Sequence, residues 1–210
     1  MTSLPRKKSS RRQIQKEETR RIILAAAYSL FGLRGYEKTT MRELADRADV
    51  GLGTIFKHFP DKPSLLISTF REDLEAVIQN SFDTIPSSNI KMQLTHIVAE
   101  LYEFFGQNPA FSRILIKEGA FFEGSYGEML TEKALFFRDK IEGVLKKAAE
   151  RGELDPAKKI REVALTFMSF FLLALIGGLR ESEFNVKKQT LFFASLLDNH
   201  FAGSLMPGKT

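Results

Sequence analysis

The stretch TTMRELADRADVGLGTIFKHF, residues 39–59, decides the fold of this chain of 210 residues. Thr40 is followed three residues later by Glu43, which is the pattern of a capping box at the start of a helix. Behind this cap the apolar residues recur at helical spacing and form one narrow stripe: Met41, Leu44, Ala45 and Ala48. After a break at 49–51 a second helical piece follows, and Pro60 ends it. The stretch predicts two short helices joined by a tight turn.

The same stretch contains Gly51-Leu52-Gly53, the Gly-x-Gly spacing found in loops that bind nucleotide phosphates. Such a loop follows a strand and needs a third glycine, or a Gly-Lys-Ser/Thr ending. Here the preceding element is a predicted helix, and Phe56 stands at the position of the third glycine. The two glycines therefore do not mark a nucleotide site. A helix, a tight turn and a second short helix are the parts of a helix-turn-helix motif, whose second helix enters the major groove of DNA.

Basic residues are concentrated in the first part of the chain, although the net charge of the whole is only +5. Residues 1–60 hold 13 Lys and Arg against 6 Asp and Glu, a net charge of +7, whereas residues 61–210 hold 18 against 20, a net charge of −2. This split predicts a polyanionic partner for the front of the chain, with a merely solvated basic surface as the alternative. The chain has no cysteine, which excludes disulfides, thiolate metal sites and cysteine nucleophiles.

Apolar residues recur at helical spacing over most of the remaining chain, and no segment alternates with the period of a strand. Residues 1–18 are basic, polar and aperiodic, so we expect a disordered arm there. Asp155 followed by Pro156 is the pattern of a helix start. Helices are expected from residue 19 to Gly35, after Asp61, and over 91–105, 128–151, 157–180 and 187–202.

The segment TTMRELADRADVGLGTIFKHFPDKPSLL, residues 39–66, is similar to the DNA-binding signature of the TetR/AcrR family of transcriptional regulators. That signature is a helix opened by Thr or Ser, a turn ending in Val, then Gly-Thr-aliphatic-aromatic-x-His-Phe, and a Lys shortly after. The resemblance spans residues 19–70 without gaps. It implies an all-α fold with an N-terminal three-helix helix-turn-helix domain at 19–70 (motif 40–59) and a C-terminal helical effector-binding and dimerisation domain at 71–210.

The resemblance also implies DNA-binding roles for residues at matching positions. The positions that match phosphate contacts are Thr39, Thr40, His58 and Lys62. The start of the recognition helix, where base edges are read, matches Leu52, Gly53 and Thr54. The implied set is Thr39, Thr40, Leu52, Gly53, Thr54, Phe56, Lys57, His58 and Lys62. Val50, Ile55 and Phe59 are expected to hold the recognition helix on the core.

Two positions depart from the family pattern. Phe56 stands where the family usually has a Tyr that contacts phosphate, and Leu52 stands where a polar or basic residue is common. Positions 52, 55, 56 and 59 also share one helical stripe. The alternative for Phe56 and Leu52 is therefore that both face the protein core.

Phenylalanine is abundant after residue 70, and much of it occurs in adjacent pairs at 104–105, 121–122, 136–137, 170–171 and 192–193. Two adjacent residues of a helix cannot both face one core, so some of these rings need a second apolar surface. A ligand cavity or a subunit interface supplies one. Together with the family resemblance this predicts an apolar effector pocket, with Glu118 as a candidate for a ligand headgroup. The candidate set is Phe104, Phe105, Phe111, Glu118, Phe121, Phe122, Phe137 and Phe171.

Residues 163–179, VALTFMSFFLLALIGGL, carry no charge over 17 positions. A membrane-spanning helix needs about 20 apolar residues, so this run lies at the lower limit. A helix buried by its own domain on one side and by a second copy of the chain on the other explains the same composition. The family resemblance implies that the last two helices form the dimer, so we expect a homodimer through residues 157–202 and no membrane segment.

The leading functional hypothesis is a cytoplasmic, homodimeric repressor that an apolar effector releases from a pseudo-palindromic DNA operator. The phenylalanine-rich interior resembles that of family members that sense fatty acyl chains or hydrophobic drugs. The alternative is a DNA-binding regulator without a small effector, whose large domain serves only dimerisation or protein contacts. The chain has three scattered histidines and no grouping of catalytic residues, so we expect no enzyme activity, no cofactor and no metal.

Overall fold

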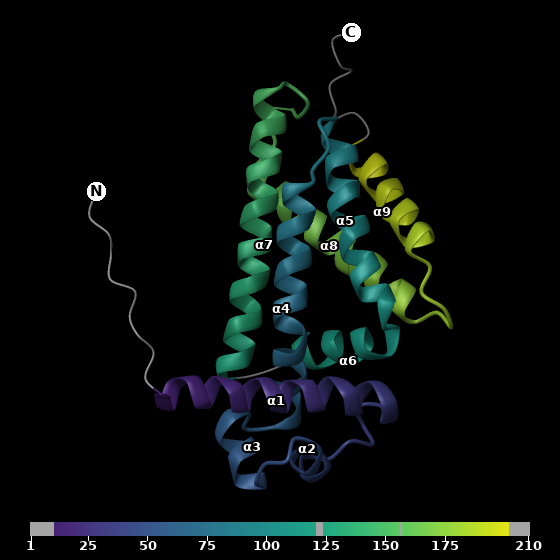
Figure 1. Cartoon of the computed structure of the whole chain (residues 1–210). Coiled ribbons are helices and arrows are strands. Elements are labelled where there is room, and N and C mark those ends of the chain that lie inside the picture. Colours follow the sequence, from purple (N-terminus) through teal and green to yellow (C-terminus); the bar gives the residue numbers. More distant parts are fainter. Residues whose placement is uncertain (1–10, 121–123, 156, 202–210) are drawn as a thin grey trace, which may run out of the picture. The chain divides into compact units, whose positions relative to one another are not determined.

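The computed structural model describes residues 11–120, 124–155 and 157–201. Within these ranges the chain forms nine α-helices and no strand (Figure 1), which confirms the all-α fold class. The chain divides after Arg71 into two compact units, residues 1–71 and 72–210. The division falls inside one helix, α4 (Lys62–Asp83), which therefore contributes to both units.

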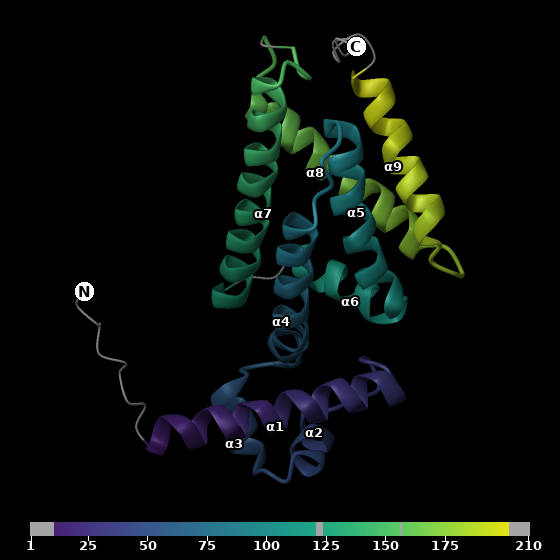
Figure 2. The ribbon, with the colours of Figure 1, turned by 45° about the horizontal axis from the view of Figure 1, so that its top comes forward.

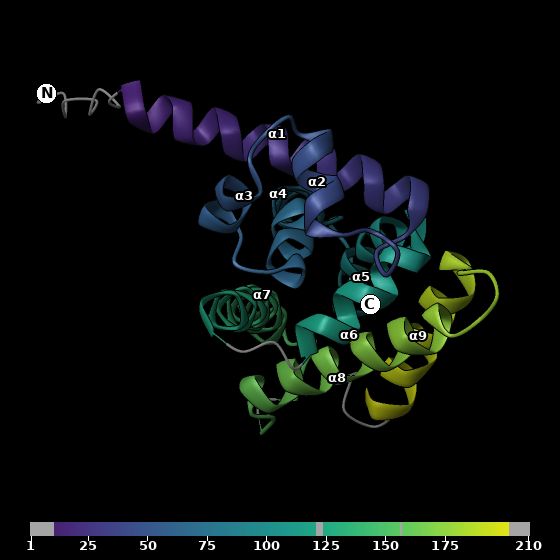
Figure 3. The ribbon, with the colours of Figure 1, turned by 90° about the horizontal axis from the view of Figure 1, so that it is seen from below.

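The N-terminal unit contains α1 (Arg11–Arg34), α2 (Met41–Arg47), α3 (Leu52–His58) and the first turns of α4. Figure 3 shows α2 and α3, the two short helices that follow α1 and precede α4 along the chain. Each helix contributes one apolar face to a shared core. The core residues include Ile23, Ala27, Phe31, Leu44, Ile55, Phe59, Leu65 and Leu66.

The disordered arm expected at 1–18 is wrong for residues 11–18, which form the first two turns of α1. Every side chain from 11 to 18 is exposed, so this part of the helix has no apolar periodicity that could have revealed it. The segment is rich in Arg, Gln, Lys and Glu, which have high intrinsic helix propensity. Residues 1–10 lie outside the described part of the chain.

The C-terminal unit contains the second half of α4 and five further helices: α5 (Ile90–Gln107), α6 (Pro109–Ala120), α7 (Gly124–Glu150), α8 (Ile160–Leu179) and α9 (Val186–Phe201). Helix α8 packs against α7 and α9, and α9 also lies along α5 (Figure 2). The helix start expected at Asp155-Pro156 is wrong, because Asp155 instead forms a tight turn in which its side chain accepts a hydrogen bond from the backbone of Ala157, at 2.9 Å. Helix α8 begins only at Ile160.

The phenylalanine pairs divide between the core and the outside in a regular way. In each of the four pairs that the structure describes, the second ring is buried: Phe105, Phe137, Phe171 and Phe193. The first ring of two of these pairs is largely exposed, 52% for Phe136 and 45% for Phe192. Three of the buried rings meet at Phe171, which lies beside Phe105 and Phe137, and the ring of Tyr102 stacks on that of Phe171 with centroids 5.5 Å apart. The Tyr102 hydroxyl donates to the backbone oxygen of Phe171 at 3.0 Å, and burial raises the pKa of this phenol.

The connection between α8 and α9 is held by the ring of Phe184, which packs between α5 and α8. Phe184 is buried, and a methyl group added at Gly106 of α5 would lie 2.9 Å from its ring. A methyl group added at Gly178 of α8 would lie 2.8 Å from the same ring and 2.6 Å from the side chain of Gln189. Arg113 of α6 donates from Nε to the backbone oxygen of Leu179 and from Nη2 to that of Glu181, the latter at 3.0 Å. These contacts fix where α9 begins relative to α8.

Helix α8 is the one helix, among the residues described, whose length and apolar composition would allow it to cross a membrane. Its most apolar window has a mean hydropathy of 2.0, and 44% of that window is buried inside the protein. A core helix of a soluble protein meets the same criterion, so the composition of α8 calls for an apolar surface but not for a membrane.

Candidate nucleic-acid interface

The start of α2 has the predicted capping box. Thr40 Oγ1 accepts a hydrogen bond from the backbone N–H of Glu43 at 3.2 Å, and the backbone N–H of Thr40 donates to Glu43 Oε2 at 2.9 Å. The hydrogen bonds that the Thr40 backbone N–H and the Thr40 hydroxyl donate to the Glu43 carboxylate, followed by the attraction of Arg34, hold the pKa of that carboxyl below its usual value. Arg34 at the end of α1 pairs with this carboxylate at 2.9 Å. The cap thus also fixes the start of α2 to the end of α1.

The turn between α2 and α3 is tight because one residue adopts a left-handed backbone conformation. Asp49 has φ of +52°, a region that Asp tolerates better than most residues. The next amide, that of Val50, donates back to Ala45 O at 3.0 Å and closes the turn. Helix α3 then starts after Gly51, which provides no side-chain cap.

Helix α3 presents two different faces. Ile55 and Phe59 on one face are fully buried, as expected for the residues that hold the helix on the core. Phe56, in contrast, is 47% exposed, so the alternative that it belongs to the core is wrong. Gly53 and Lys57 are also exposed, and the half-buried residues at the margin of this face are Leu52, Thr54 and His58. The exposed face and its margin therefore hold the α3 residues to which the family resemblance assigns DNA contacts.

Two of the expected phosphate contacts require correction. Thr39 is buried, and its hydroxyl donates to the backbone oxygen of Gly35 at 2.9 Å, so this side chain holds the loop before α2. The Lys62 ammonium donates to the backbone oxygens of Tyr36 at 3.0 Å and Thr39 at 3.1 Å. It also lies over the Tyr36 ring, 4.3 Å from the centroid. Both side chains support the domain, whereas Thr40 remains exposed at the start of α2.

His58, at the end of α3, lies beside basic residues of α1. The pKa of its imidazole is lowered mainly by partial desolvation, and next by the positive charges of Lys16 and Arg20, while Glu17 opposes them. The guanidinium of Arg20 lies 4.8 Å from the centroid of the Phe59 ring. A disordered arm at 1–18 would give Lys16 no fixed position, so the sequence did not predict that Lys16 lies next to α3. The signal in the sequence was the four-residue spacing of Arg12, Lys16 and Arg20, which places them on one side of a helix.

The residues expected to line an effector pocket fall into three groups. Phe105, Phe111, Phe137 and Phe171 are buried, and their rings pack in the core of the C-terminal unit, with Phe171 centred 6.4 Å from Phe105 and 6.1 Å from Phe137. Phe104 is half-buried beside Phe105. Phe121 and Phe122 lie outside the described residues, and of Glu118 only the backbone, within α6, is described. An apolar ligand among the four buried rings would have to displace them.

Comparison with known proteins places this geometry in a family. Residues 23–69 match the profile of the bacterial regulatory proteins of the tetR family. Similar proteins include the transcriptional repressor KstR of Mycobacterium tuberculosis, 25% identical over 175 residues that cover 82% of this chain and 77% of that protein. Another is the transcriptional regulator SrpR of Pseudomonas putida, 26% identical over 172 residues that cover 80% of this chain and 78% of that one.

Solved structures show the same fold. The chain is similar to FadR of Thermus thermophilus, a TetR-family repressor in complex with lauroyl-CoA, with a TM-score of 0.72, 21% identity and coverage of 90% of this chain and 97% of that one. It is also similar to FadR of Bacillus subtilis in complex with stearoyl-CoA, with a TM-score of 0.69, 17% identity and coverage of 84% and 96%. The sequence match falls on α1 to α4, where the capped α2, the tight turn and the two-faced α3 form the helix-turn-helix, and this part of the chain is a DNA-binding domain of the tetR family of bacterial regulatory proteins.

Proposed function

We propose that this protein is a homodimeric, cytoplasmic transcriptional repressor that an apolar small molecule releases from a pseudo-palindromic operator. The observation that carries the DNA-binding part is the division of α3 into a buried and an exposed face. Ile55 and Phe59 hold the helix, so that Gly53, Phe56 and Lys57 point outward together. A short helix held in this way can enter the major groove with its polar and small residues against the base edges.

The dimeric part is supported by an apolar surface on the last two helices. On α8, Leu165, Leu172, Leu173 and Ile176 are 48%, 42%, 55% and 38% exposed. Their spacing places them on one side of α8, and Leu191 and Phe192 of α9 add side chains that are 61% and 45% exposed. We call these six residues the α8–α9 face. An apolar face of this kind is typical of a contact with a second copy of the chain, because a two-fold axis lets the same patch cover itself.

Two copies are also what operator recognition requires. A single helix-turn-helix reads few base pairs, whereas a dimer presents two recognition helices to half-sites about 34–36 Å apart. A ligand that favours one separation of the two recognition helices over another would change operator affinity by its differential binding to the two states.

The chemistry of the effector is proposed from the interior of the C-terminal unit and from the relatives. Two structurally similar proteins are bound to lauroyl-CoA and stearoyl-CoA. The interior of this chain is lined by phenylalanine rings from α5, α6, α7 and α8, which suit an acyl chain or a hydrophobic drug better than a polar ligand. Fatty acyl-CoA thioesters are therefore the first class of effector to test.

The test begins with selection of bound sequences from a pool of random duplex DNA, because it needs no knowledge of the operator. We expect a two-fold symmetric sequence with half-sites about one helical turn apart. Lauroyl-CoA and stearoyl-CoA are then added, with free coenzyme A as the control that lacks the acyl chain. Release of the selected duplex by the thioesters and not by coenzyme A supports the proposal. Recovery of no common sequence would overturn the DNA-binding part.

The alternative function, a regulator without a small effector, is supported by the dense packing of Phe105, Phe137 and Phe171 against one another. It predicts that the selected duplex stays bound in the presence of acyl-CoA thioesters, free fatty acids and hydrophobic drugs alike. It also predicts that none of these compounds raises the melting temperature of the protein, since a ligand that binds only the folded state must raise it.

A further inference from the structure

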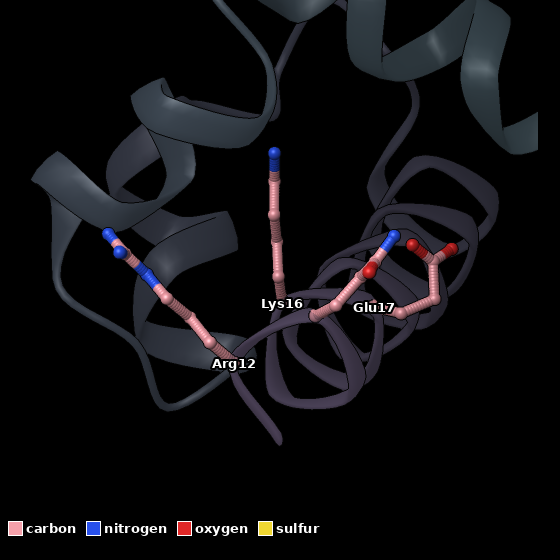
Figure 4. Close-up of a pocket in the computed structure, with 4 residues that line it drawn as sticks. Arg12, Lys16 and Glu17 are labelled. Carbon is pink, nitrogen blue, oxygen red and sulfur yellow. The ribbon is translucent and has the colours of Figure 1, made fainter. Parts of the chain in front are cut away.

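The first turns of α1 carry a group of basic side chains that lies outside the helix-turn-helix itself. Arg12 and Lys16, with Gln13 and Glu17, line an open recess of about 480 Å³ (Figure 4). In the figure both basic side chains extend away from the helix, with the guanidinium of Arg12 and the ammonium of Lys16 at their outer ends. Arg20 follows one turn later on the same side of α1. We call Arg12, Lys16 and Arg20 the α1 ridge.

The α1 ridge adjoins the end of the recognition helix. Lys16 and Arg20 are close enough to His58 for their positive charges to act on its imidazole, and Arg20 lies over the ring of Phe59. From Arg12 to Arg20 the helix rises about 12 Å, at 1.5 Å per residue. That length corresponds to roughly three to four base pairs along one DNA strand, at 3.4 Å each. The ridge therefore extends the positive surface at the end of α3 by the length of several nucleotides.

The charges of the ridge are not neutralised within the described part of the protein. Neither Arg12 nor Lys16 forms an ion pair there, whereas Arg21 on another side of α1 pairs with Glu18 at 3.7 Å. The recess also takes in one carboxylate, that of Glu17. Like charges placed one helical turn apart repel each other, which costs free energy that a polyanion would recover.

We propose that the α1 ridge binds the sugar-phosphate backbone of the DNA beside the groove that α3 enters. This inference rests on the proposed DNA-binding function and adds a second contact region to it. Long, flexible cationic side chains on an exposed helix neutralise phosphates without reading bases. The ridge therefore raises the affinity for every duplex by a similar factor and sets the position of α3, while α3 selects the sequence.

The experiment compares the full chain with the double variant Arg12→Gln/Lys16→Gln. Glutamine keeps a high helix propensity, so α1 is preserved and circular dichroism with thermal melting verifies it. The matched control is Lys146→Gln/Lys147→Gln, which removes the same net charge from exposed positions of α7 in the other unit. Binding of the selected duplex and of a scrambled duplex is measured over a series of salt concentrations.

We expect the ridge variant to bind both duplexes more weakly by a similar factor. The slope of log K against log salt should become shallower by about 1.8 per half-site, or about 3.6 for the dimer, because each lost phosphate contact removes about 0.9. The variant Glu17→Gln should act in the opposite direction and tighten binding to both duplexes, since it removes the carboxylate beside the ridge. The α7 control should leave the salt slope unchanged.

The outcomes separate this inference from the function on which it rests. If the unmodified chain binds no duplex, the proposed function fails. If it binds but the ridge variant keeps the salt slope of the α7 control, the function stands and the phosphate contact of the α1 ridge is wrong. A loss confined to the selected duplex would also overturn the inference, because it would show that the ridge reads sequence.

Discussion

The outer faces of α3 and of the α8–α9 pair differ sharply, although the inner faces of these helices are built alike. In both regions fully buried apolar residues hold the helix on its own unit, Ile55 and Phe59 on α3, and Phe167 and Leu175 on α8. Outward, α3 presents Gly53, Lys57 and one aromatic ring, whereas α8 presents a row of leucines and an isoleucine. The buried face thus determines the fold, and the exposed face indicates the partner: a polyanion in one case and a second apolar surface in the other.

The largest effect is expected when the apolar outer face of α8 is made charged. The double variant Leu172→Glu/Leu173→Glu places two carboxylates on the α8–α9 face, and two-fold symmetry doubles them in the dimer. Each unpaired charge buried in the contact costs several kcal/mol, so dimerisation should weaken by at least a thousandfold. Sedimentation should then change from about twice 23.8 kDa to a single chain. Both substituted residues are exposed in the isolated chain, so its helix content should be retained.

The control for this variant is Lys146→Glu/Lys147→Glu, which adds the same number of carboxylates at exposed positions outside the face. It should remain dimeric. A double variant of α8 that still sediments as a dimer would remove the α8–α9 face from the proposed mechanism.

A smaller effect distinguishes two lysines that look alike in the sequence. Lys62→Ala should lower the free energy of unfolding by about 1–3 kcal/mol, because the carbonyls of Tyr36 and Thr39 lose a charged donor. Lys57→Ala should leave the melting temperature unchanged, since this side chain is exposed, and should weaken DNA binding instead. Thermal melting and duplex binding measured on both variants check the pair. Equal melting temperatures would show that the contacts of Lys62 add nothing to stability.

Phe56→Tyr sharpens the assignment of the exposed face of α3. Because Phe56 is 47% exposed, an added hydroxyl can remain in contact with water and does not need a partner inside the protein. A phosphate contact from this hydroxyl should tighten binding a few-fold, about 1 kcal/mol, with an unchanged melting temperature. Calorimetry and duplex titration measure the two quantities. A melting temperature several degrees lower would place the ring against the core after all.

The smallest effect is a pH dependence at His58. Its pKa in the folded protein lies below the ordinary value of 6.5, mainly through desolvation and then through Lys16 and Arg20. The unfolded chain therefore binds the proton first as the pH falls below 6.5, and the folded state loses a little stability there. DNA phosphate favours the protonated ring, so duplex affinity should rise over the same range. His58→Asn should remove both trends, and if both persist in that variant another group is responsible.

The sequence predicts α2, the turn and α3 well because their signals are local. Thr40 and Glu43 form a cap within one helical turn, and Pro60 ends a helix through its own ring. The sequence predicts the first turns of α1 poorly, because they are exposed on all sides and leave no apolar period. At Asp155-Pro156 the local sequence favours a helix start, but Asp155 forms a turn there instead.

The sequence does not predict side-chain roles that depend on residues far away along the chain. Lys62 matches a phosphate-binding position, yet it reaches the carbonyls of residues 36 and 39, more than twenty positions away along the chain. Thr39 and Thr40 are neighbouring residues of the same type, and only the folded structure shows that Thr39 is the buried one. The phenylalanine pairs indicate that only one ring of each pair faces the core, and the helix register determines which ring that is.

Gly106, Gly178 and Phe184 have a consequence for how the chain can evolve. The ring of Phe184 occupies space that the two glycines leave open, so a larger residue at either position collides with it. The three positions should therefore change together among related proteins: where a side chain appears at 106 or 178, the residue at 184 should become smaller. An alanine at Gly106 that harms this chain should be tolerated beside a smaller residue at 184, because the Phe184 ring is the nearest group there. We therefore expect the start of α9 to depend on three residues that change as a group, one in α5, one in α8 and one in the loop after α8.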